Sequence, residues 1–444
     1  KCVLNQISLG TSNLCFSGEA LMPQLSPREM CEVLEGRYVN YLTTSFPFRD
    51  PHLRKTFEAA LQRDALSKGP YLQATPSYCP GARLADAFSE ILGSRPDEGF
   101  LTALQGDRPL YRHQEAALRK ICSGRNVVVS TGTGSGKTEA FLLPIILHLY
   151  SQFMQKALTP GVRALVLYPM NALANDQRDR LAGKPLDKKD PGGILHRLER
   201  FRSPFEFSFG QYIGETPEDE RDSRRNAKDA IQNRLFGELA LRSEIRKTPP
   251  HILLTNFSML EYLLLRPDDS PLFDQGNAKN WTFLVLDEAH QYRGAKATEM
   301  SMLIRRLKQR LRDGGQTGPF RCIATSASLA NGDNEKGDVA SFASNLFDEP
   351  FEAEDVIFGE PEPAPFEARA SLNLEDYRGL LAVLDGTQDR CAAFDRVALG
   401  AFNGSGEEKV SAAILRDARA MELVNLITNA PSTLSDTAAI VMKD

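Results

Sequence analysis

The chain lacks the paired cysteines of a disulfide framework or a zinc site. Its seven cysteines are odd in number and widely scattered, and none belongs to a C-x-x-C pair. Its six histidines form no cluster that would suit a metal. This usage argues against a disulfide-rich secreted protein and against a structural zinc site. A reduced, cytoplasmic compartment is the simplest interpretation.

Long apolar runs and an excess of positive charge are also missing. No run of eighteen apolar residues occurs, so we expect no membrane-spanning helix. The net charge of −5 does not indicate a nucleic-acid-binding protein, although a net charge averages over all faces and leaves room for a local basic groove. The first residues lack both a Met and the pattern of a signal peptide. We therefore expect the chain to begin partway into a longer protein.

What the sequence does contain is enough apolar material for more than one domain. A length of 444 residues is too great for a single core, and 42% hydrophobic residues are typical of a globular protein. Short apolar runs alternate with longer amphipathic segments, and we predict strands at residues 126–130, 163–168, 251–255, 282–286 and 321–325. Their nearly continuous hydrophobicity predicts an α/β fold in which helices flank a buried parallel sheet.

Two weaker elements and three regions complete the predicted organisation. Residues 205–209 alternate apolar and polar side chains, which predicts a half-buried strand, and Thr216 with the Pro and acids after it predicts a helix start. We divide the chain into a mixed N-terminal accessory region at residues 1–100, a central domain at 101–358, and a linker with a mostly helical region at 359–444.

The stretch "VVVSTGTGSGKTEAF", residues 127–141, places glycines between a buried strand and the start of a helix. Backbone N–H groups and the positive end of the helix dipole converge there, which favours a phosphate over the alternative of a purely structural turn. The Lys side chain then reaches the β- and γ-phosphates, and the Thr hydroxyl binds Mg²⁺. The residues assigned to the nucleotide in this loop are Gly132, Thr133, Gly134, Ser135, Gly136, Lys137 and Thr138.

A second motif, "LVLDEAH", places two carboxylates at the end of another predicted strand. Open α/β sheets bind ligands at that edge. Asp287 is suited to hold Mg²⁺ through its water shell, and Glu288 to polarise the attacking water. Alone, the motif also fits a solvated helix start, but its place after a phosphate loop favours catalysis by Lys137, Asp287 and Glu288.

Together these motifs resemble the first RecA-like domain of a superfamily-two DEAD/DEAH-box helicase. The resemblance covers roughly residues 109–330. "PLYRHQEAAL" resembles the adenine-reading Q motif, which implies that Gln114 reads the base, with Tyr111 as a second candidate. Thr131 stands where the strict phosphate-loop pattern has Gly, and this is normal in that family. ATP and Mg²⁺ are the cofactors that the resemblance implies.

The resemblance also implies nucleic-acid contacts. "LVLYPMNALANDQ" resembles motif Ia and "LLTNFSMLEYLLL" the next contacting motif. The residues implied in these contacts are Pro169, Asn171, Ala172, Thr255 and Asn256. Thr255 and Asn256 also fit an alternative role as caps of the following helix. Residues 325–328, "TSAS", stand where the family has S-A-T, so Ser326 and Ser328, with His290, are implied in coupling hydrolysis to movement.

Finer features resemble the YprA/MrfA-type and Lhr-like branch, whose core is shared by several bacterial antiviral-defence helicases. "YIGETPEDER" and "DEAHQYRG" carry this likeness. It implies an ATP-dependent DNA helicase or translocase that acts on single-stranded DNA or a tailed duplex. Two alternatives stay open, namely an RNA helicase and a nucleic-acid-binding scaffold subunit that has lost hydrolysis.

One expected motif is missing. No Q-x-x-G-R-x-G-R stretch follows Ser328, so we expect the second RecA-like domain, with its arginine finger, to lie outside this chain. That domain, and possible further subunits, are the protein partners implied. Because the transition-state charge needs this arginine, the chain alone is expected to be inactive.

Overall fold

The structure is a computed structural model of the whole chain. It describes residues 27–63, 71–72, 77–132, 134–183, 192–274, 276–327 and 333–362, with 378, 420, 422–423, 426, 432–433 and 437 near the C-terminus. The chain divides into two compact units, one formed by residues 1–76 with 363–444 and the other by Ser77–Glu362. The second unit therefore includes residues 77–100, which lie N-terminal to the domain boundary expected from the sequence.

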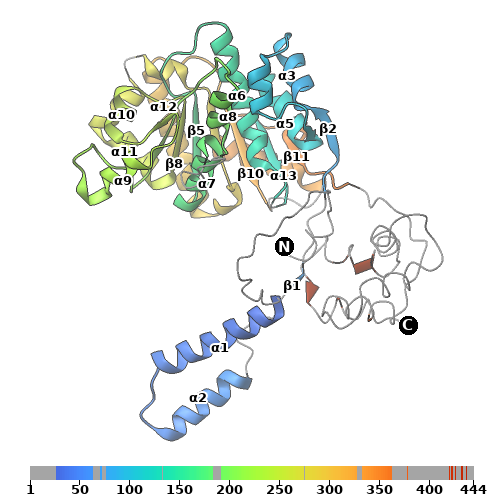
Figure 1. Cartoon of the computed structure of the whole chain (residues 1–444), viewed down its shortest axis with the longest axis vertical. Helices are drawn as coiled ribbons and strands as arrows, with labels where there is room; N and C mark the ends of the chain where they lie inside the picture. Colours follow the sequence, from blue (N-terminus) through green and yellow to red (C-terminus); the bar gives the residue numbers. More distant parts are fainter. Residues whose placement is uncertain are drawn as a thin grey trace, which may run out of the picture. The chain divides into compact units, whose positions relative to one another are not determined.

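An eight-stranded sheet forms the centre of the Ser77–Glu362 unit (Figure 1). All neighbouring strands pair in parallel, in the order β11-β4-β10-β9-β5-β8-β6-β7. Its strands are β4 Val127–Ser130, β5 Ala164–Tyr168, β6 Phe209–Tyr212, β7 Glu238–Leu239, β8 Ile252–Asn256, β9 Phe283–Leu286, β10 Arg321–Ser326 and β11 Val356–Phe358. The predicted α/β class with a parallel, RecA-like sheet is thereby confirmed.

Helices cover both faces of this sheet. They are α3 Leu84–Leu92, α4 Glu98–Ala103, α5 Arg112–Cys122, α6 Lys137–Met154, α7 Asn171–Ala182, α8 Ile194–Arg200, α9 Ala227–Gln232, α10 Arg242–Lys247, α11 Phe257–Leu265, α12 Ala295–Asp313 and α13 Lys336–Phe347. Successive residues of a strand point to opposite faces. Val127 and Val129 of β4 accordingly join the core that α3 to α8 cover, whereas Val128 joins the core under α11 to α13. This two-sided burial explains why the strands are continuously hydrophobic.

A two-stranded antiparallel sheet, β2 Pro80–Arg83 with β3 Pro109–Tyr111, precedes the first helix of the motif region. Because α5 begins directly after Tyr111, this small sheet fixes where the Q-motif residues start. In addition, α5 packs beside α6, the helix that follows the phosphate loop. The Q motif and the phosphate loop are thus held next to each other by adjacent helices.

The five strands expected from apolar runs are all present, but two weaker predictions were wrong. Residues 205–208 form no strand, and β6 begins only at Phe209. The alternation in this stretch instead reflects a loop whose Phe205 and Phe207 side chains are buried in the core. Nor does a helix start at Thr216. Its hydroxyl bonds back to the end of β6, accepting from Ile213 N at 3.0 Å and donating to Gln211 O at 2.8 Å, so it closes a turn instead of capping a helix.

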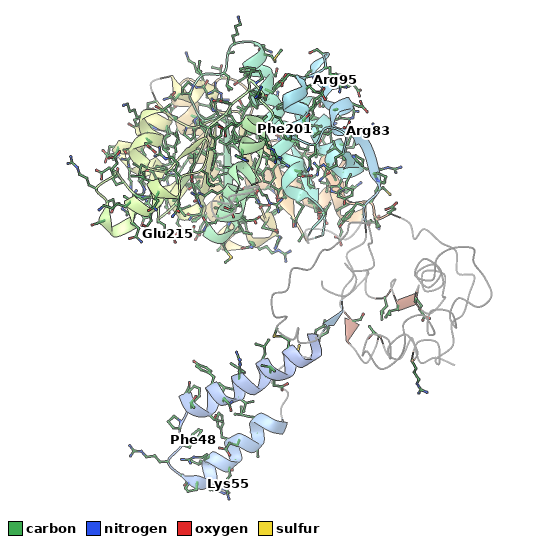
Figure 2. All side chains as sticks on the ribbon, in the orientation of Figure 1. Phe48, Lys55, Arg83, Arg95, Phe201 and Glu215 are labelled. Atoms are coloured by element: carbon green, nitrogen blue, oxygen red, sulfur yellow. The ribbon has the colours of Figure 1, made fainter. Side chains whose placement is uncertain are left out.

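In the other unit, α1 Pro27–Ser45 and α2 Pro51–Arg63 form a helical hairpin. Phe48, in the connection between them, contacts the Phe57 ring edge-to-face at 5.2 Å between centroids (Figure 2). A short antiparallel pair joins β1 Tyr71–Leu72 to β12 Ser432–Thr433. The mostly helical region expected at 359–444 lies largely outside the described residues. Among the helices that the structure describes, none combines the length and hydropathy needed to cross a bilayer.

Candidate nucleotide site and nucleic-acid edge

The phosphate loop joins the end of β4 to the start of α6. Gly134 and Gly136 adopt positive φ angles of 81° and 78°, which L side chains rarely adopt, so glycine is required at both positions. Thr131 is buried, and its hydroxyl lies 2.6 Å from that of Ser135. This contact explains how the loop closes with Thr where the strict pattern has Gly. Thr133 lies outside the described residues.

Lys137 and Thr138 open α6 at the end of this loop. The Lys137 ammonium lies 3.3 Å from Oε1 of Glu288, so the structure brings together two of the three residues predicted to be catalytic. The Thr138 hydroxyl accepts a hydrogen bond from Nε2 of Gln177, on α7, at 3.4 Å. Sequence reasoning did not single out Gln177, which ties the helix of motif Ia to the predicted Mg²⁺ ligand.

The two carboxylates of the DEAH motif follow β9 at the carboxyl edge of the sheet. Asp287 is 7% exposed, and burial raises its pKa, while a hydrogen bond from the Thr325 hydroxyl acts in the opposite direction. Glu288 N–H donates to Asp287 Oδ1 at 3.2 Å and to the Thr325 hydroxyl at 3.3 Å. Thr325, at the end of β10, is therefore a member of this site that the sequence analysis missed.

His290 lies between the DEAH motif and the end of β10. Its Nδ1 is 3.2 Å from Glu288 Oε2 and 3.2 Å from the Ser326 hydroxyl. The structure thus brings two of the three predicted coupling residues into contact. Ser328 lies outside the described residues. The imidazole thus lies between the Glu288 carboxylate and β10, and its coupling role stays a prediction.

Oxygen donors at this edge suit Mg²⁺, which prefers carboxylate, hydroxyl and water oxygens. Thr138 supplies a hydroxyl from the first turn of α6, and Asp287 supplies a carboxylate from the end of β9. Among the residues that the structure describes, no group of three or more His, Cys, Asp or Glu could hold a metal by protein side chains alone. A magnesium ion held by a few protein oxygens, water and phosphates is consistent with that donor set.

Gln114, predicted to read the adenine, lies behind the phosphate loop and is 2% exposed. Its Nε2 donates to Gly136 O at 3.1 Å and to Glu139 Oε2 at 2.9 Å, and its Oε1 accepts from Tyr111 N at 3.0 Å. The side chain is thus engaged with the loop itself. Base reading by Gln114 stays a prediction.

The residues predicted to bind nucleic acid lie at the carboxyl ends of two neighbouring strands, β5 and β8. Pro169 follows β5, and Asn171 begins α7. Asn256 ends β8, donates from Nδ2 to Asn171 Oδ1 at 2.7 Å, and accepts from Met259 N at 2.8 Å. The two motifs therefore meet through one amide pair. The bond to Met259 also matches the capping alternative.

Thr255 is oriented differently from Asn256. It is fully buried, and its hydroxyl donates to Tyr212 O at 2.6 Å across the β6–β8 ladder. This places its side chain in the sheet and not at the surface. The side chain of Ala172 lies outside the described residues. Contact of these motifs with nucleic acid stays a prediction, centred on Asn171 and Asn256.

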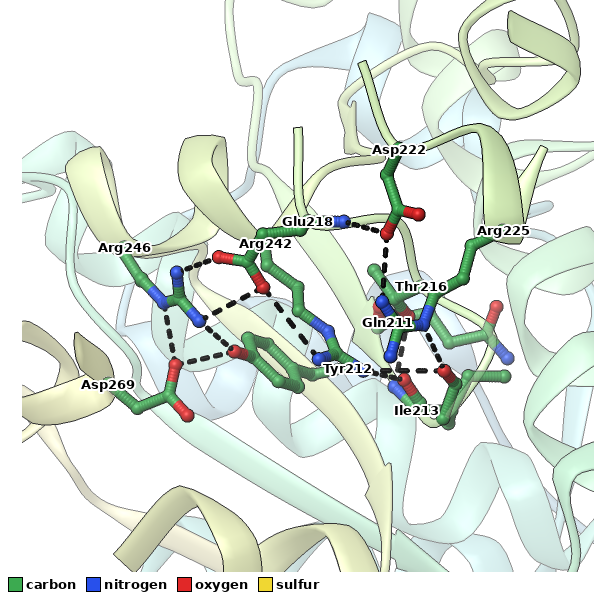
Figure 3. Close-up of polar contacts among 11 residues, drawn as sticks. Gln211, Tyr212, Ile213, Thr216, Glu218, Asp222, Arg225, Arg242, Arg246 and Asp269 are labelled. Atoms are coloured by element: carbon green, nitrogen blue, oxygen red, sulfur yellow. Dashed lines mark hydrogen bonds and ion pairs between the residues drawn. The ribbon is translucent and has the colours of Figure 1, made fainter. Parts of the chain in front are cut away.

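A turn after β6, residues 213–218, lies at the same edge and is held by buried charges (Figure 3). The Arg242 guanidinium donates to Ile213 O at 2.9 Å and is 2% exposed. Arg246 contacts Glu218 and also pairs with the fully buried Asp269 at 2.6 Å. These arginines fix the "GETPE" turn, where the sequence analysis noted a family likeness and wrongly predicted a helix start.

Comparisons with known proteins agree with this geometry. The DEAD/DEAH box helicase family matches residues 111–189, which include most of the Q motif, the phosphate loop and motif Ia. Druantia protein DruE of Escherichia coli (strain UMEA 4076-1) is 33% identical over 375 residues, which cover 66% of this chain and 20% of that protein. The uncharacterized ATP-dependent helicase YprA of Bacillus subtilis (strain 168) is 31% identical over 239 residues, or 53% of this chain and 25% of that protein.

Among solved structures, DUF1998 helicase MrfA bound to DNA and AMPPNP is similar, with a TM-score of 0.45 and 22% sequence identity. The match covers 78% of this chain and 42% of that one. The present chain spans a quarter or less of the length of DruE and YprA. The family match falls on the phosphate loop, and the likeness to DruE covers 66% of the chain, so this chain carries a DEAD/DEAH-box helicase domain and is similar to DruE and YprA.

Proposed function

We propose that this chain is the first motor domain of an ATP-dependent DNA helicase or translocase. The observation that carries the proposal is the meeting of Lys137, from the phosphate loop, with Glu288, from the DEAH motif, at 3.3 Å. A cation for phosphates and a carboxylate for water are the two groups that phosphoryl transfer to water requires at one point. They come from elements 151 residues apart in the chain.

The Lys137–Glu288 contact suggests how nucleotide arrival prepares the site. In the structure, the ammonium of Lys137 pairs with the Glu288 carboxylate. A triphosphate in the loop offers Lys137 a stronger anionic partner, at the positive end of α6. Glu288 is then released to accept a hydrogen bond from water, with His290 Nδ1 lying 3.2 Å from its Oε2.

Mg²⁺ fits the same proposal. Thr138 and Asp287 would hold it, directly and through water, and the ion would neutralise charge on the phosphates when bound. The raised pKa of Asp287 has a consequence here, because a carboxyl that loses its proton less readily binds a cation less readily at low pH. The hydrogen bond from Thr325 favours the ionised carboxylate and so works for metal binding.

For nucleic acid, we propose that the Asn171–Asn256 pair lies under the sugar-phosphate backbone of a single strand. Amide groups at a strand-to-helix junction suit phosphate oxygens, which carry no sequence information. The neighbouring 213–218 turn, held by Arg242 and Arg246, extends the same edge of the sheet. We propose DNA and not RNA as the substrate because the motifs of this chain resemble those of the YprA/MrfA-type and Lhr-like branch.

Strand-release assays on the complete protein test this function. The substrates are tailed DNA and tailed RNA duplexes of the same sequence, with ATP and Mg²⁺. The proposal predicts ATP-dependent release of the DNA strand. Release of RNA alone would replace DNA helicase by RNA helicase. Strand binding with no ATP hydrolysis would favour the scaffold alternative.

A further inference from the structure

A polar chain runs behind the phosphate loop from Arg108 to Gly136. Arg108 Nη1 contacts both carboxylate oxygens of Glu139, at 2.8 and 3.0 Å. Glu139 Oε2 accepts from Gln114 Nε2 at 2.9 Å, and the same amide nitrogen donates to Gly136 O at 3.1 Å. An arginine before β3 is thereby connected to the backbone of the loop through two side chains.

The orientation of the Gln114 amide follows from the chemistry of its partners. A carboxylate and a carbonyl only accept hydrogen bonds, so the NH₂ group must face Glu139 and Gly136. A backbone N–H only donates, so the amide oxygen must face Tyr111 N, at 3.0 Å. Both N–H donors of Gln114 are therefore used within the protein. If Glu139 lost its charge, this constraint on the amide would be weaker.

The residue before Gln114 makes a parallel contact. His113 Nε2 lies 3.0 Å from Ser135 O, and its Nδ1 has no hydrogen-bond partner among the described residues. Burial lowers the pKa of His113, which favours the neutral ring. The proton of a neutral ring then belongs on Nε2, where it is donated to Ser135 O. The first turn of α5 thus holds two successive carbonyls of the phosphate loop.

Held carbonyls determine where the loop's N–H groups point. Every described peptide is trans, and in a trans peptide the C=O and the N–H point in opposite directions. With the carbonyls of Ser135 and Gly136 directed towards α5, the N–H groups of Gly136 and Lys137 point away from α5. That is the side from which phosphate oxygens approach a loop of this kind.

We propose that Arg108 and Glu139 are positioning residues for the nucleotide's phosphates. Acting through Gln114, they hold the peptide after Gly136 so that its N–H faces the phosphate. The inference rests on the proposed ATP-binding function and adds two residues to it. The close contact between the Gln114 amide and the loop supports this role. A Cβ added to Gly136 would overlap with Gln114 Nε2.

This role predicts an effect that does not depend on the base. The chain of contacts ends on the loop's backbone, so its loss should weaken every nucleoside triphosphate alike. The fold itself should tolerate the changes. The Arg108 and Glu139 side chains are 35% and 30% exposed, and ion pairs that water reaches contribute little to stability.

The test compares Arg108→Met and Glu139→Gln with the unchanged complete protein in steady-state hydrolysis of ATP and of GTP. We expect KM to rise roughly tenfold for each nucleotide, which corresponds to the loss of one charge-assisted hydrogen bond. We expect kcat to stay within about twofold of its value in the unchanged protein. Arg108→Lys keeps the charge and should restore most of the affinity. Arg310→Met is the matched control, because Arg310 forms an ion pair of similar exposure with Asp274 at 2.6 Å, on α12, which packs on the other face of the sheet from α5 and α6.

The outcomes separate this inference from the proposed function. Unchanged KM values in both variants, with hydrolysis still lost in Lys137→Ala, overturn the inference and leave the function standing. A rise in KM for ATP but not for GTP also overturns it, in favour of base reading by Gln114. Absence of hydrolysis in the unchanged protein contradicts the function itself. Thermal melting of each variant shows whether a higher KM reflects a damaged fold. The double exchange R108E/E139R shows whether the higher KM reflects loss of the Arg108–Glu139 contact.

Discussion

Glu288 has a backbone φ of 53°, in the left-handed region that few residues with a side chain adopt. Such strain persists where the surroundings hold it. Here the Glu288 N–H is fixed by Asp287 and by the Thr325 hydroxyl, and the carboxylate lies between Lys137 and His290. At this position the conformation directs the side chain to the phosphate loop.

Changing Glu288→Gln should slow ATP hydrolysis by the complete protein by about 10²-fold or more, with little change in nucleotide affinity. The amide keeps the shape of the side chain and its contact distance to Lys137 but no longer polarises water. Hydrolysis and the binding of a fluorescent ATP analogue measure the two effects separately. Glu299→Gln, on the exposed face of α12, is the control. An unchanged rate would place the catalytic base elsewhere.

At this scale the motifs predicted which candidate side chains would lie at one edge of the sheet, but not the residues that support them. Lys137, Asp287 and Glu288 were predictable because each follows a strand in a short, recognisable pattern. Thr325 was not singled out for its bond to Asp287, and the Glu139 contacts with Arg108 and Gln114 were also missed. These contacts join residues 25 to 38 positions apart, and they depend on which strands and helices become neighbours.

At the scale of elements, hydrophobic continuity was a reliable guide and alternation was not. The five predicted strands are almost entirely buried runs between helices. In contrast, β7 and β11 contain only two and three residues and offer no pattern of their own. The alternation at Phe205 and Phe207 reflects packing of a loop on the core, where Phe205 contacts Tyr150 ring to ring at 5.4 Å.

The junctions after β5 and β8 allow a test of the nucleic-acid edge. Asn256→Ala removes both the pair with Asn171 and the cap on α11, whereas Asn171→Ala removes only the pair. We expect both variants to weaken single-strand binding, severalfold and for all sequences, because backbone contacts carry no base preference. Only Asn256→Ala should also lose about 1 kcal/mol of stability.

Fluorescence anisotropy with a labelled single strand, together with thermal melting, measures both quantities. Gln211→Ala is a matched control at the next strand, since its amide bonds Asn175 at 2.7 Å without capping a helix. Lower melting temperature in Asn256→Ala with unchanged strand affinity in both asparagine variants would assign the junction to capping alone.

At the scale of the whole molecule, the chain matches only part of longer relatives and contains no arginine-finger motif after Ser328. Stabilising the transition-state charge needs such an arginine. We therefore expect the purified 444-residue chain to bind ATP weakly and to hydrolyse it at a rate close to background. Rapid ATP hydrolysis by the purified 444-residue chain that is lost in its Lys137→Ala variant would contradict this expectation. It would mean that the chain supplies the arginine itself, for example by dimerising.

We propose that the edge formed by the phosphate loop and the DEAH motif hydrolyses ATP and is stimulated by nucleic acid. The most direct measurement is ATP hydrolysis by the complete protein with and without single-stranded DNA, for the wild type, Lys137→Ala, and Lys247→Ala as an exposed control on α10. We expect DNA-stimulated hydrolysis in the wild type and in Lys247→Ala, and loss of hydrolysis in Lys137→Ala. Near-normal, DNA-stimulated hydrolysis in Lys137→Ala would contradict it.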